Sequence, residues 1–264
     1  MSDWPRRVGL IGTGAMGRAL AAGLARGRPD LAERLTLTDS QPRALEAALA
    51  DVGGRVGTLE DVAACDLVCL AVKPGDAEGA LAAARGALRP DAVLLSVVAG
   101  WTLDRLSAAA PGVPLARTMP NLAVRHGAGV VALSTRHLPD GMEERLRGVL
   151  APLGAVVPLP ETLFPAATAL AGSGPGLVAL VAEALEEGAV SSGLSRPQAR
   201  EMVVAVLAGT AALLSDGGDP AALRQRVSSP GGSTVAGVAV LERGAVRAHL
   251  ADAVRAAAER SAEL

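Results

Sequence analysis

The chain has 264 residues, half of them hydrophobic, which is ample for a large buried core and favours two domains over one. It carries 25 basic and 27 acidic residues, so the formal net charge is -2. This near-neutral charge does not favour binding to nucleic acid or to an anionic membrane, and a small molecule is the expected partner. Tyrosine is absent, which excludes mechanisms that rely on a tyrosine proton donor.

A glycine-rich turn near the start of the chain is the first segment that points to a ligand. An apolar strand over residues 8–11 runs into the sequence GTGAMG, and a helix rich in alanine and leucine is expected over residues 15–26. The next strand, residues 35–38, ends at Asp39. A lone GxGxxG motif is weak evidence, but a strand before it, a helix after it and an acidic residue at the end of the following strand are the context that dinucleotide binding requires.

Each glycine of this turn has an expected role. Gly12 permits the tight turn, Gly14 lets a pyrophosphate approach the backbone, and Gly17 lets the helix pack closely against the strand. The helix N-terminus then holds the phosphates. Further backbone or side-chain contacts to the same ligand are expected from Thr13, Ala15 and Met16.

Strand and helix patterns alternate through the first half of the chain, which predicts an α/β fold with a doubly wound, Rossmann-type parallel sheet. The ligand-bearing loops of such a sheet follow the strand ends, and here they read VKPGD, SVVAGW and RTMPN. The expected helices cover residues 42–52, 76–88 and 140–150, and the expected strands cover residues 67–71, 92–98, 129–133 and 155–158.

Lys73, in the first of these loops, is the only lysine in the chain. A single lysine among so many arginines suggests a role that arginine cannot fill, and the alternative is a solvated side chain beside a proline turn. Cys65 and Cys69 have no histidine or cysteine nearby that could complete a metal site, so they are expected to be free buried thiols. No metal site is predicted. Free thiols and the lack of an apolar run before Val8 are typical of a cytoplasmic protein.

The segment 159–164 contains prolines and is expected to link a dinucleotide-binding domain, residues 1–160, to a helical domain, residues 161–264. The helical patterns of the second domain are apolar over most of their circumference, so a partner subunit is expected to cover them. Residues 162–182 carry no charge and are long enough to span a membrane. The sequence GSGPG interrupts them and basic anchors are missing, which favours a buried helix preceded by a hinge.

A second glycine-rich stretch, residues 228–234 with the sequence SSPGGST, lies between two expected helices. Its glycines bring the backbone close to a small ligand, and its serine and threonine side chains supply hydroxyl groups. An apolar helix pattern begins directly afterwards, so the stretch could receive a carboxylate at a helix N-terminus. The alternative is a surface turn that only caps the helix.

Six segments, IGTGAMG, AVKP, SVVAG, RTMPN, ALAGSGPG and SSPGGSTVAGVAVLE, together resemble the Δ1-pyrroline-5-carboxylate reductase family over nearly the whole chain. The last segment is the most specific. The resemblance implies an NAD(P)H-binding N-terminal domain and an all-α C-terminal dimerisation domain. It also implies reduction of the C=N bond of 1-pyrroline-5-carboxylate to give L-proline, by homodimers that often assemble into a decamer.

The resemblance also implies site residues. The cofactor pyrophosphate is expected at Gly12, Gly14, Met16 and Gly17. The substrate carboxylate and ring nitrogen are expected at Gly231, Gly232, Ser233 and Thr234, with the Thr234 hydroxyl bound to the ring nitrogen as the catalytic contact. The nicotinamide side is expected to be lined by Ala71, Val72, Lys73 and Pro74, with Asn121 beside it.

The chain departs from the family pattern where the cofactor ribose is expected. Many members have an arginine after the second strand for the 2′-phosphate of NADPH, whereas this chain has Asp39 and Ser40, and an aspartate there favours the free diol of NADH. Arg43 could partly compensate, so the cofactor is expected to be NADPH or NADH without a stated preference. Two further departures are Gly75, which ends the VKPG loop, and Ser233, where a threonine is usual.

Other two-domain reductases are less consistent with the sequence. The β-hydroxyacid dehydrogenases and ketopantoate-type reductases use a catalytic lysine from the helical domain, and this chain has no lysine after Lys73. Two alternatives stay open. One is a redox sensor that holds a dinucleotide without turnover, although it would not need the stretch 228–234. The other is a reductase of a related cyclic imine.

Overall fold

A computed structural model gives the fold of residues 4–263, which form two compact units. Of the described residues, the first unit contains residues 4–172 and 257–263, and the second contains Ser173–Ala256. Phe164, Ala169 and Ala171, which precede Gly172, are all buried. The domain boundary expected at residue 160 stays a prediction.

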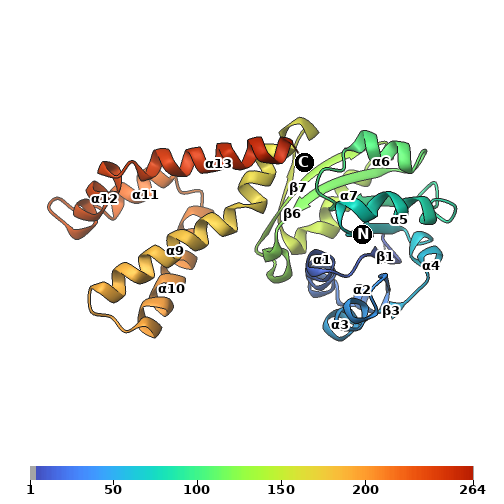
Figure 1. Cartoon of the computed structure of the whole chain (residues 1–264), viewed down its shortest axis with the longest axis horizontal. Coiled ribbons are helices and arrows are strands. Elements are labelled where there is room, and N and C mark those ends of the chain that lie inside the picture. Colours follow the sequence, from blue (N-terminus) through green and yellow to red (C-terminus); the bar gives the residue numbers. More distant parts are fainter. Residues whose placement is uncertain (1–3, 264) are drawn as a thin grey trace. The chain divides into compact units, whose positions relative to one another are not determined.

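The first unit is built on an eight-stranded sheet with the order β3-β2-β1-β4-β5-β6-β7-β8 (Figure 1). The sheet is parallel as predicted except between β6 and β7, which pair antiparallel. Its order reverses between β1 and β4, the two adjacent central strands. The strands are β1 Val8–Ile11, β2 Leu35–Thr38, β3 Arg55–Val56, β4 Leu67–Leu70, β5 Val93–Ser96, β6 Leu115–Pro120, β7 Gly129–Arg136 and β8 Gly154–Pro158.

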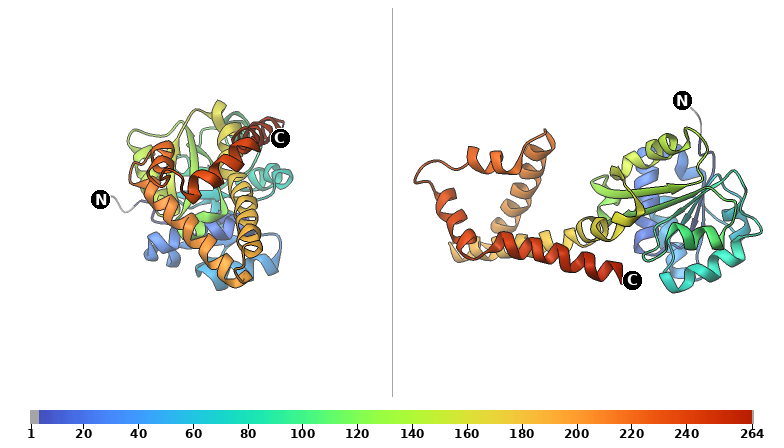
Figure 2. Two further views of the ribbon diagram at one scale, coloured as in Figure 1. Left: turned by 90° about the vertical axis from the view of Figure 1, so that its left-hand side faces the viewer. Right: turned by 90° about the horizontal axis from the view of Figure 1, so that it is seen from above.

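Helices cover both faces of this sheet (Figures 1 and 2). The strand β4 shows why, because its side chains alternate between two hydrophobic cores. Leu67 and Cys69 join the core formed with α1, α3 and α7, whereas Val68 and Leu70 join the core formed with α4, α5 and α6. The helices of this unit are α1 Ala15–Gly27, α2 Pro29–Glu33, α3 Pro42–Val52, α4 Leu59–Ala63, η1 Pro74–Asp76, α5 Ala77–Ala84, α6 Leu103–Ala109, η2 Leu122–His126, α7 Met142–Leu150, η3 Ala151–Leu153, η4 Glu161–Leu163, α8 Phe164–Ala167 and the π-helix η5 Thr168–Gly172.

Two segments differ from the sequence prediction. The sequence RTMPN is not a loop, because its first four residues end β6 and only Asn121 follows the strand. The expected linker 159–164 is partly helical and fixed to the sheet. Glu161 accepts hydrogen bonds of 2.7 Å from the Leu103 N–H and from Arg117, whose guanidinium carbon lies 4.5 Å from the centroid of the Phe164 ring.

The predicted state of the two cysteines is confirmed, because both are buried free thiols. Burial, followed by the nearby Cys65, raises the pKa of the Cys69 thiol to about 12. A thiol with so high a pKa carries almost no thiolate at neutral pH, so it is unreactive. Cys69 therefore serves as a small apolar side chain of the sheet.

The second unit is entirely helical, as predicted. Ser195 and Gln198 form a capping box at the start of α10, and Asp219 caps α11 through the N–H groups of Ala221 and Ala222. Gly193, which ends the preceding helix, has a φ of +106°. The helices that begin in this unit are α9 Gly174–Ser191, α10 Arg196–Ser215, α11 Pro220–Arg226, α12 Ser233–Arg243 and α13 Val246–Ala262.

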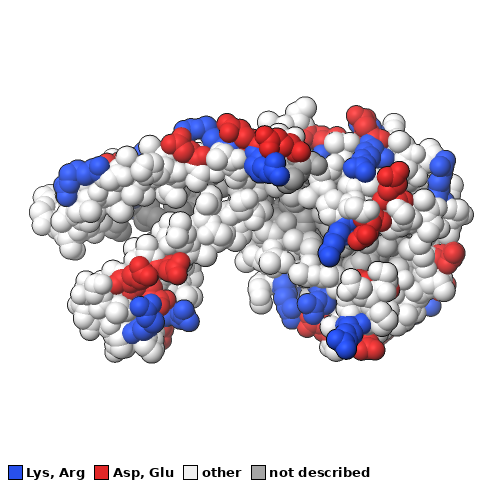
Figure 3. Space-filling view, in the orientation of Figure 1, with Lys and Arg blue, Asp and Glu red and all other residues white. Residues whose placement is uncertain are grey.

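Much apolar side-chain surface of the helical unit is exposed. Leu180 is 65% exposed and Val204 is 61% exposed, and Figure 3 shows that charged side chains of the helical unit gather in a few clusters separated by uncharged surface. Among residues 4–263, the helical stretch Glu161–Ser191 is long and apolar enough to cross a membrane, but only 22% of its most apolar window is buried. Within a single chain, the helix that was predicted to be buried is therefore largely exposed. An exposed apolar surface of this kind is typical of an interaction site.

Candidate functional site

A cavity of about 730 Å³ opens at the carboxyl ends of β1, β2 and β4. This is the point at which the strand order reverses, where open α/β sheets bind their ligands. Its walls come from the glycine turn, the loops after β2 and β4, and the helices that follow them. The lining residues are Ile11, Gly12, Gly14, Thr38, Asp39, Ser40, Gln41, Ala44, Leu59, Ala71, Val72, Lys73, Gly75, Asp76, Gly79 and Ala80.

The three glycines of the turn differ in what surrounds them. Gly12 has a φ of +93°, and a Cβ there would lie 2.6 Å from the carbonyl oxygen of Ala71. A Cβ on Gly17 would lie 2.1 Å from the carbonyl oxygen of Gly12. Both positions therefore need glycine for the fold itself, as predicted. A Cβ on Gly14 would meet no atom within 4 Å, so the fold leaves open space at that position.

Asp39 lies where β2 ends and is bonded to two loops. Its Oδ2 accepts hydrogen bonds from the Thr13 N–H at 2.6 Å and the Thr13 hydroxyl at 2.9 Å, and its Oδ1 accepts one from the Gln41 N–H at 2.8 Å. Partial burial acts to raise the pKa of this carboxyl group, but the bonds from Thr13, Gln41 and the Ser40 N–H outweigh it and hold the pKa below its ordinary value. Asp39 is therefore ionised at neutral pH.

A tryptophan side chain is hydrogen-bonded to the loop after β4. The indole Nε1–H of Trp101 donates a hydrogen bond of 3.1 Å to the carbonyl oxygen of Pro74, and the Trp101 side chain is buried. The guanidinium carbon of Arg105 lies 4.0 Å from the centroid of the indole ring. Trp101 thus fixes the loop that carries Lys73 along the cavity wall.

We expect Trp101→Phe to lower the free energy of unfolding by about 1–3 kcal/mol, because it removes the hydrogen bond to the Pro74 carbonyl and leaves part of the space around a buried side chain unfilled. Denaturant unfolding measures this change. Arg105→Ala is the control, since it removes only the cation above the ring and should cost less than about 1 kcal/mol. Equal losses in the two variants would show that the indole N–H does not hold the loop.

The structure brings about half of the predicted cofactor residues to the cavity wall. Those that line it are Gly12, Gly14, Asp39, Ser40, Ala71, Val72 and Lys73, whereas Thr13, Ala15, Met16, Gly17, Pro74 and Asn121 do not. Sequence reasoning missed Gln41, Ala44 and Leu59. The first two follow Asp39 closely enough to be found from the strand end, but Leu59 comes from a short helix that the sequence did not reveal.

Asn121 is engaged with the protein itself. Its Nδ2 donates a hydrogen bond of 3.0 Å to the carbonyl oxygen of Ala171, and its Oδ1 accepts one of 3.2 Å from the Ala123 N–H. The side chain thereby joins the end of β6 to the π-helix η5, which precedes α9. Its predicted place beside the nicotinamide stays a prediction.

The stretch 228–234 joins α11 to α12 in the helical unit. Gly231 has a φ of +72°, and Gly232 is the N-cap of α12, where no side chain makes a capping hydrogen bond. The first N–H groups of α12 are therefore left for another acceptor. The Ser228 hydroxyl donates to the carbonyl oxygen of Arg224 at 2.7 Å, whereas Thr234 lies half-buried in the first turn of the helix. Thr234 is not the cap, so the capping alternative does not explain its hydroxyl.

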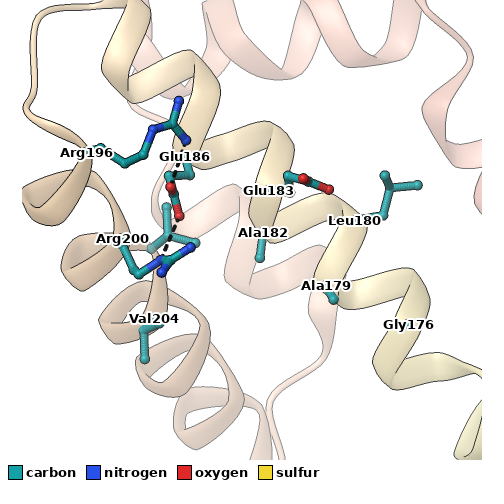
Figure 4. A pocket seen from close by; sticks show the side chains of 10 residues that line it. Gly176, Ala179, Leu180, Ala182, Glu183, Glu186, Arg196, Arg200 and Val204 are labelled. Atoms are coloured by element: carbon teal, nitrogen blue, oxygen red, sulfur yellow. Dashed lines mark hydrogen bonds and ion pairs between the residues drawn. The ribbon is translucent and has the colours of Figure 1, made fainter.

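A second cavity, of about 670 Å³, lies between α9 and α10 and was not foreseen. Glu186 accepts hydrogen bonds of 2.9 Å from Arg196 and 3.2 Å from Arg200, as Figure 4 shows. The bond from Arg196 is the main reason why the pKa of Glu186 lies below its ordinary value. Because these charged groups satisfy one another, the cavity presents no concentrated positive charge to an anionic ligand.

Comparison with known proteins decides the family. Residues 7–100 match a family model described as NADP oxidoreductase, coenzyme F420-dependent, and residues 161–264 match one described as pyrroline-5-carboxylate reductase dimerisation. A curated pyrroline-5-carboxylate reductase of Synechocystis sp. is 36% identical over 264 residues, which cover 98% of each chain. The chain belongs to the pyrroline-5-carboxylate reductase family.

Solved pyrroline-5-carboxylate reductases share the fold. The structure from Coxiella burnetii is 27% identical, has a TM-score of 0.90 and is matched over 98% of both chains. The pyrroline carboxylate reductase of Plasmodium falciparum, solved with NADP bound, is 26% identical with a TM-score of 0.83 over 97% of this chain and 96% of that one. The predicted family and the predicted order of a Rossmann-type domain and a helical dimerisation domain are thus confirmed.

Proposed function

We propose that the protein is an NAD(P)H-dependent oxidoreductase that reduces the C=N bond of 1-pyrroline-5-carboxylate to give L-proline, the last step of proline biosynthesis. The observation that carries this proposal is the full-length relationship to curated pyrroline-5-carboxylate reductases, 36% identical over 98% of each chain in one case. A Rossmann-type domain alone would support many reactions, but the match extends through the helical domain and the stretch 228–234.

The first unit fits a nicotinamide dinucleotide. Gly12 forms the turn, the space at Gly14 is open, and the N-terminus of α1 faces the same region. When bound, the reduced nicotinamide supplies the hydride that the imine carbon accepts. The residues that we assign to the cofactor are Gly12, Thr13, Gly14, Ala15, Met16, Gly17, Asp39, Ser40, Ala71, Val72, Lys73, Pro74 and Asn121.

The stretch 228–234 would hold the substrate. Backbone N–H groups of Gly231, Ser233 and Thr234 receive the carboxylate, whereas the Gly232 N–H donates to the Ser229 carbonyl oxygen. The Thr234 hydroxyl binds the ring nitrogen. If the substrate binds as its iminium, addition to the ring carbon moves the C=N electron pair onto nitrogen, and no further proton transfer is needed in that step. The residues of this chain therefore contribute mainly by positioning the reacting atoms.

We propose a homodimer formed through the helical unit, with assembly into a decamer as a further step. Support comes from the match to a dimerisation model and from exposed apolar side chains on these helices, including Leu180, Met202 and Leu241. Sedimentation analysis tests the assembly. We assign the protein to the cytoplasm on the strength of its two free cysteines, which suit a reducing compartment.

Steady-state kinetics with 1-pyrroline-5-carboxylate and with its six-membered homologue tests the proposed substrate. We expect the five-membered imine to have the higher kcat/KM, by about 10-fold or more, because one additional methylene in a fitted site costs about 1–3 kcal/mol. A higher kcat/KM for the larger ring would replace the proposal with the related cyclic imine as substrate.

A further inference from the structure

The carboxylate of Asp39 is fixed at one end of the cofactor cavity. Three hydrogen bonds of 2.6–2.9 Å reach it from Thr13 and Gln41, which belong to different loops. Rotation of the side chain away from the cavity would break the bonds from the glycine turn. The negative charge therefore stays where the end of β2 meets the cavity, the place at which Rossmann-type folds hold the cofactor ribose.

Among the described residues that line the cavity, the positive side chain is that of Lys73. The other charged ones are Asp39 and Asp76. Lys73 follows β4, and β1 lies between β4 and β2, so strand spacing places the two loops roughly 10 Å apart. Arg43 is exposed and is not part of the lining. A 2′-phosphate, with a charge of about -1.5 to -2, would meet a fixed carboxylate, and no arginine is among the described residues of the cavity lining.

We propose that the Thr13–Asp39 pair makes this site select NADH over NADPH. A free 2′-hydroxyl donates a charge-assisted hydrogen bond to the ionised Asp39, whereas a 2′-phosphate is repelled by it. Thr13 acts as the positioning residue, because its N–H and hydroxyl hold the carboxylate toward the ribose. The selectivity rests on the proposed function and adds a cofactor preference to it. The NADP in the Plasmodium falciparum structure belongs to that protein and its own residues.

Calorimetric titration of the full-length protein with AMP and with 2′,5′-ADP (adenosine 2′,5′-bisphosphate) tests the proposal without turnover. These nucleotides differ only in the 2′-phosphate. We expect AMP to bind on the order of 10-fold more tightly or better in the unmodified protein. Asp39→Ser should remove this preference, and Thr13→Val should reduce it in part, because the charge remains but loses one of its bonds. Asp140→Asn, at an exposed aspartate outside the cavity lining, is the matched control and should leave the ratio of affinities nearly unchanged.

Asp39→Asn repeats the test with a side chain of the same shape, in case the serine variant folds poorly. Tighter binding of 2′,5′-ADP by the unmodified protein, or an unchanged ratio in both Asp39 variants, would overturn the proposal. Failure of the proposed function has a different signature, in which the protein discriminates between the two nucleotides but does not oxidise NADH in the presence of 1-pyrroline-5-carboxylate.

Discussion

Gly14→Ala should weaken nucleotide binding by about 5- to 150-fold, corresponding to about 1–3 kcal/mol, and leave the protein folded. A Cβ at this position meets no protein atom within 4 Å, and the backbone of Gly14 has a φ of -64°, which alanine adopts without strain. Any clash must therefore come from a ligand. Gly14 is the N-cap of α1, where alanine is less favourable, so a loss of stability below about 1 kcal/mol is expected.

Two other glycine variants make this result specific to the ligand. Gly148→Ala places the same methyl group in α7, outside the cavity and with no atom within 4 Å, and should leave binding unchanged. Gly17→Ala should reduce stability itself, because its Cβ would lie 2.1 Å from the Gly12 carbonyl oxygen. Calorimetry measures the nucleotide affinity of each variant, and thermal unfolding measures its stability. Wild-type affinity in Gly14→Ala would show that no phosphate approaches the turn.

Thr234→Ala should lower kcat/KM for 1-pyrroline-5-carboxylate by about 100-fold, with most of the loss in kcat. The reason is that a hydrogen bond to the ring nitrogen would strengthen as the C=N electron pair moves onto that atom, and single donors of this kind contribute about 100- to 1,000-fold. Thr234 does not cap α12, so its removal should leave the helix in place. Steady-state kinetics with saturating cofactor separates kcat from KM.

The same stretch supplies both controls for Thr234. Thr234→Ser keeps the hydroxyl and should restore most of the activity. Ser228→Ala removes a hydroxyl that already donates to the Arg224 carbonyl at 2.7 Å, so it should change kcat little. If Thr234→Ala retains wild-type turnover and affinity, or if Thr234→Ser is as impaired as the alanine variant, the hydroxyl has no catalytic contact.

Elements with strong terminal signals could be predicted from the sequence. Pro42 begins α3 and Gly53 follows its last residue, so the predicted bounds match the observed ones. Ser195 and Asp219 likewise cap α10 and α11 through side-chain hydrogen bonds within the first turn. In these cases local chemistry fixes the end of the element, and tertiary packing has little influence on it.

The strand β6 shows where local signals were insufficient. Its last four residues belong to the segment RTMPN, whose proline and asparagine predict a loop after a strand end. Residues 115–120 nevertheless form a strand, because they pair with β5 on one side and β7 on the other. Leu115 and Ala116 are buried there. The exposed helices are a second case, because packing within one chain buries little of them. In α9, all of whose residues the structure describes, Glu186 is the one buried residue.

The candidate site likewise contains positions that the sequence predicts and contacts that it does not. The positions of Gly12, Gly17 and Asp39 follow from the strand, turn and helix pattern, and the structure confirms why two of these positions need glycine. The bond from Thr13 to Asp39 could not be predicted, because it depends on the rotamer of a side chain 26 residues away in sequence. The bond from Trp101 to Pro74 likewise joins two loops that only the fold brings together.

The central claim is that this protein turns over 1-pyrroline-5-carboxylate and does not merely bind a dinucleotide. The most direct test incubates the purified full-length protein with 1-pyrroline-5-carboxylate and either NADH or NADPH, and measures cofactor oxidation together with L-proline formed. We predict one L-proline for each cofactor molecule oxidised. The claim would be contradicted if the protein binds a nucleotide but forms L-proline with neither NADH nor NADPH. That result would support a redox sensor.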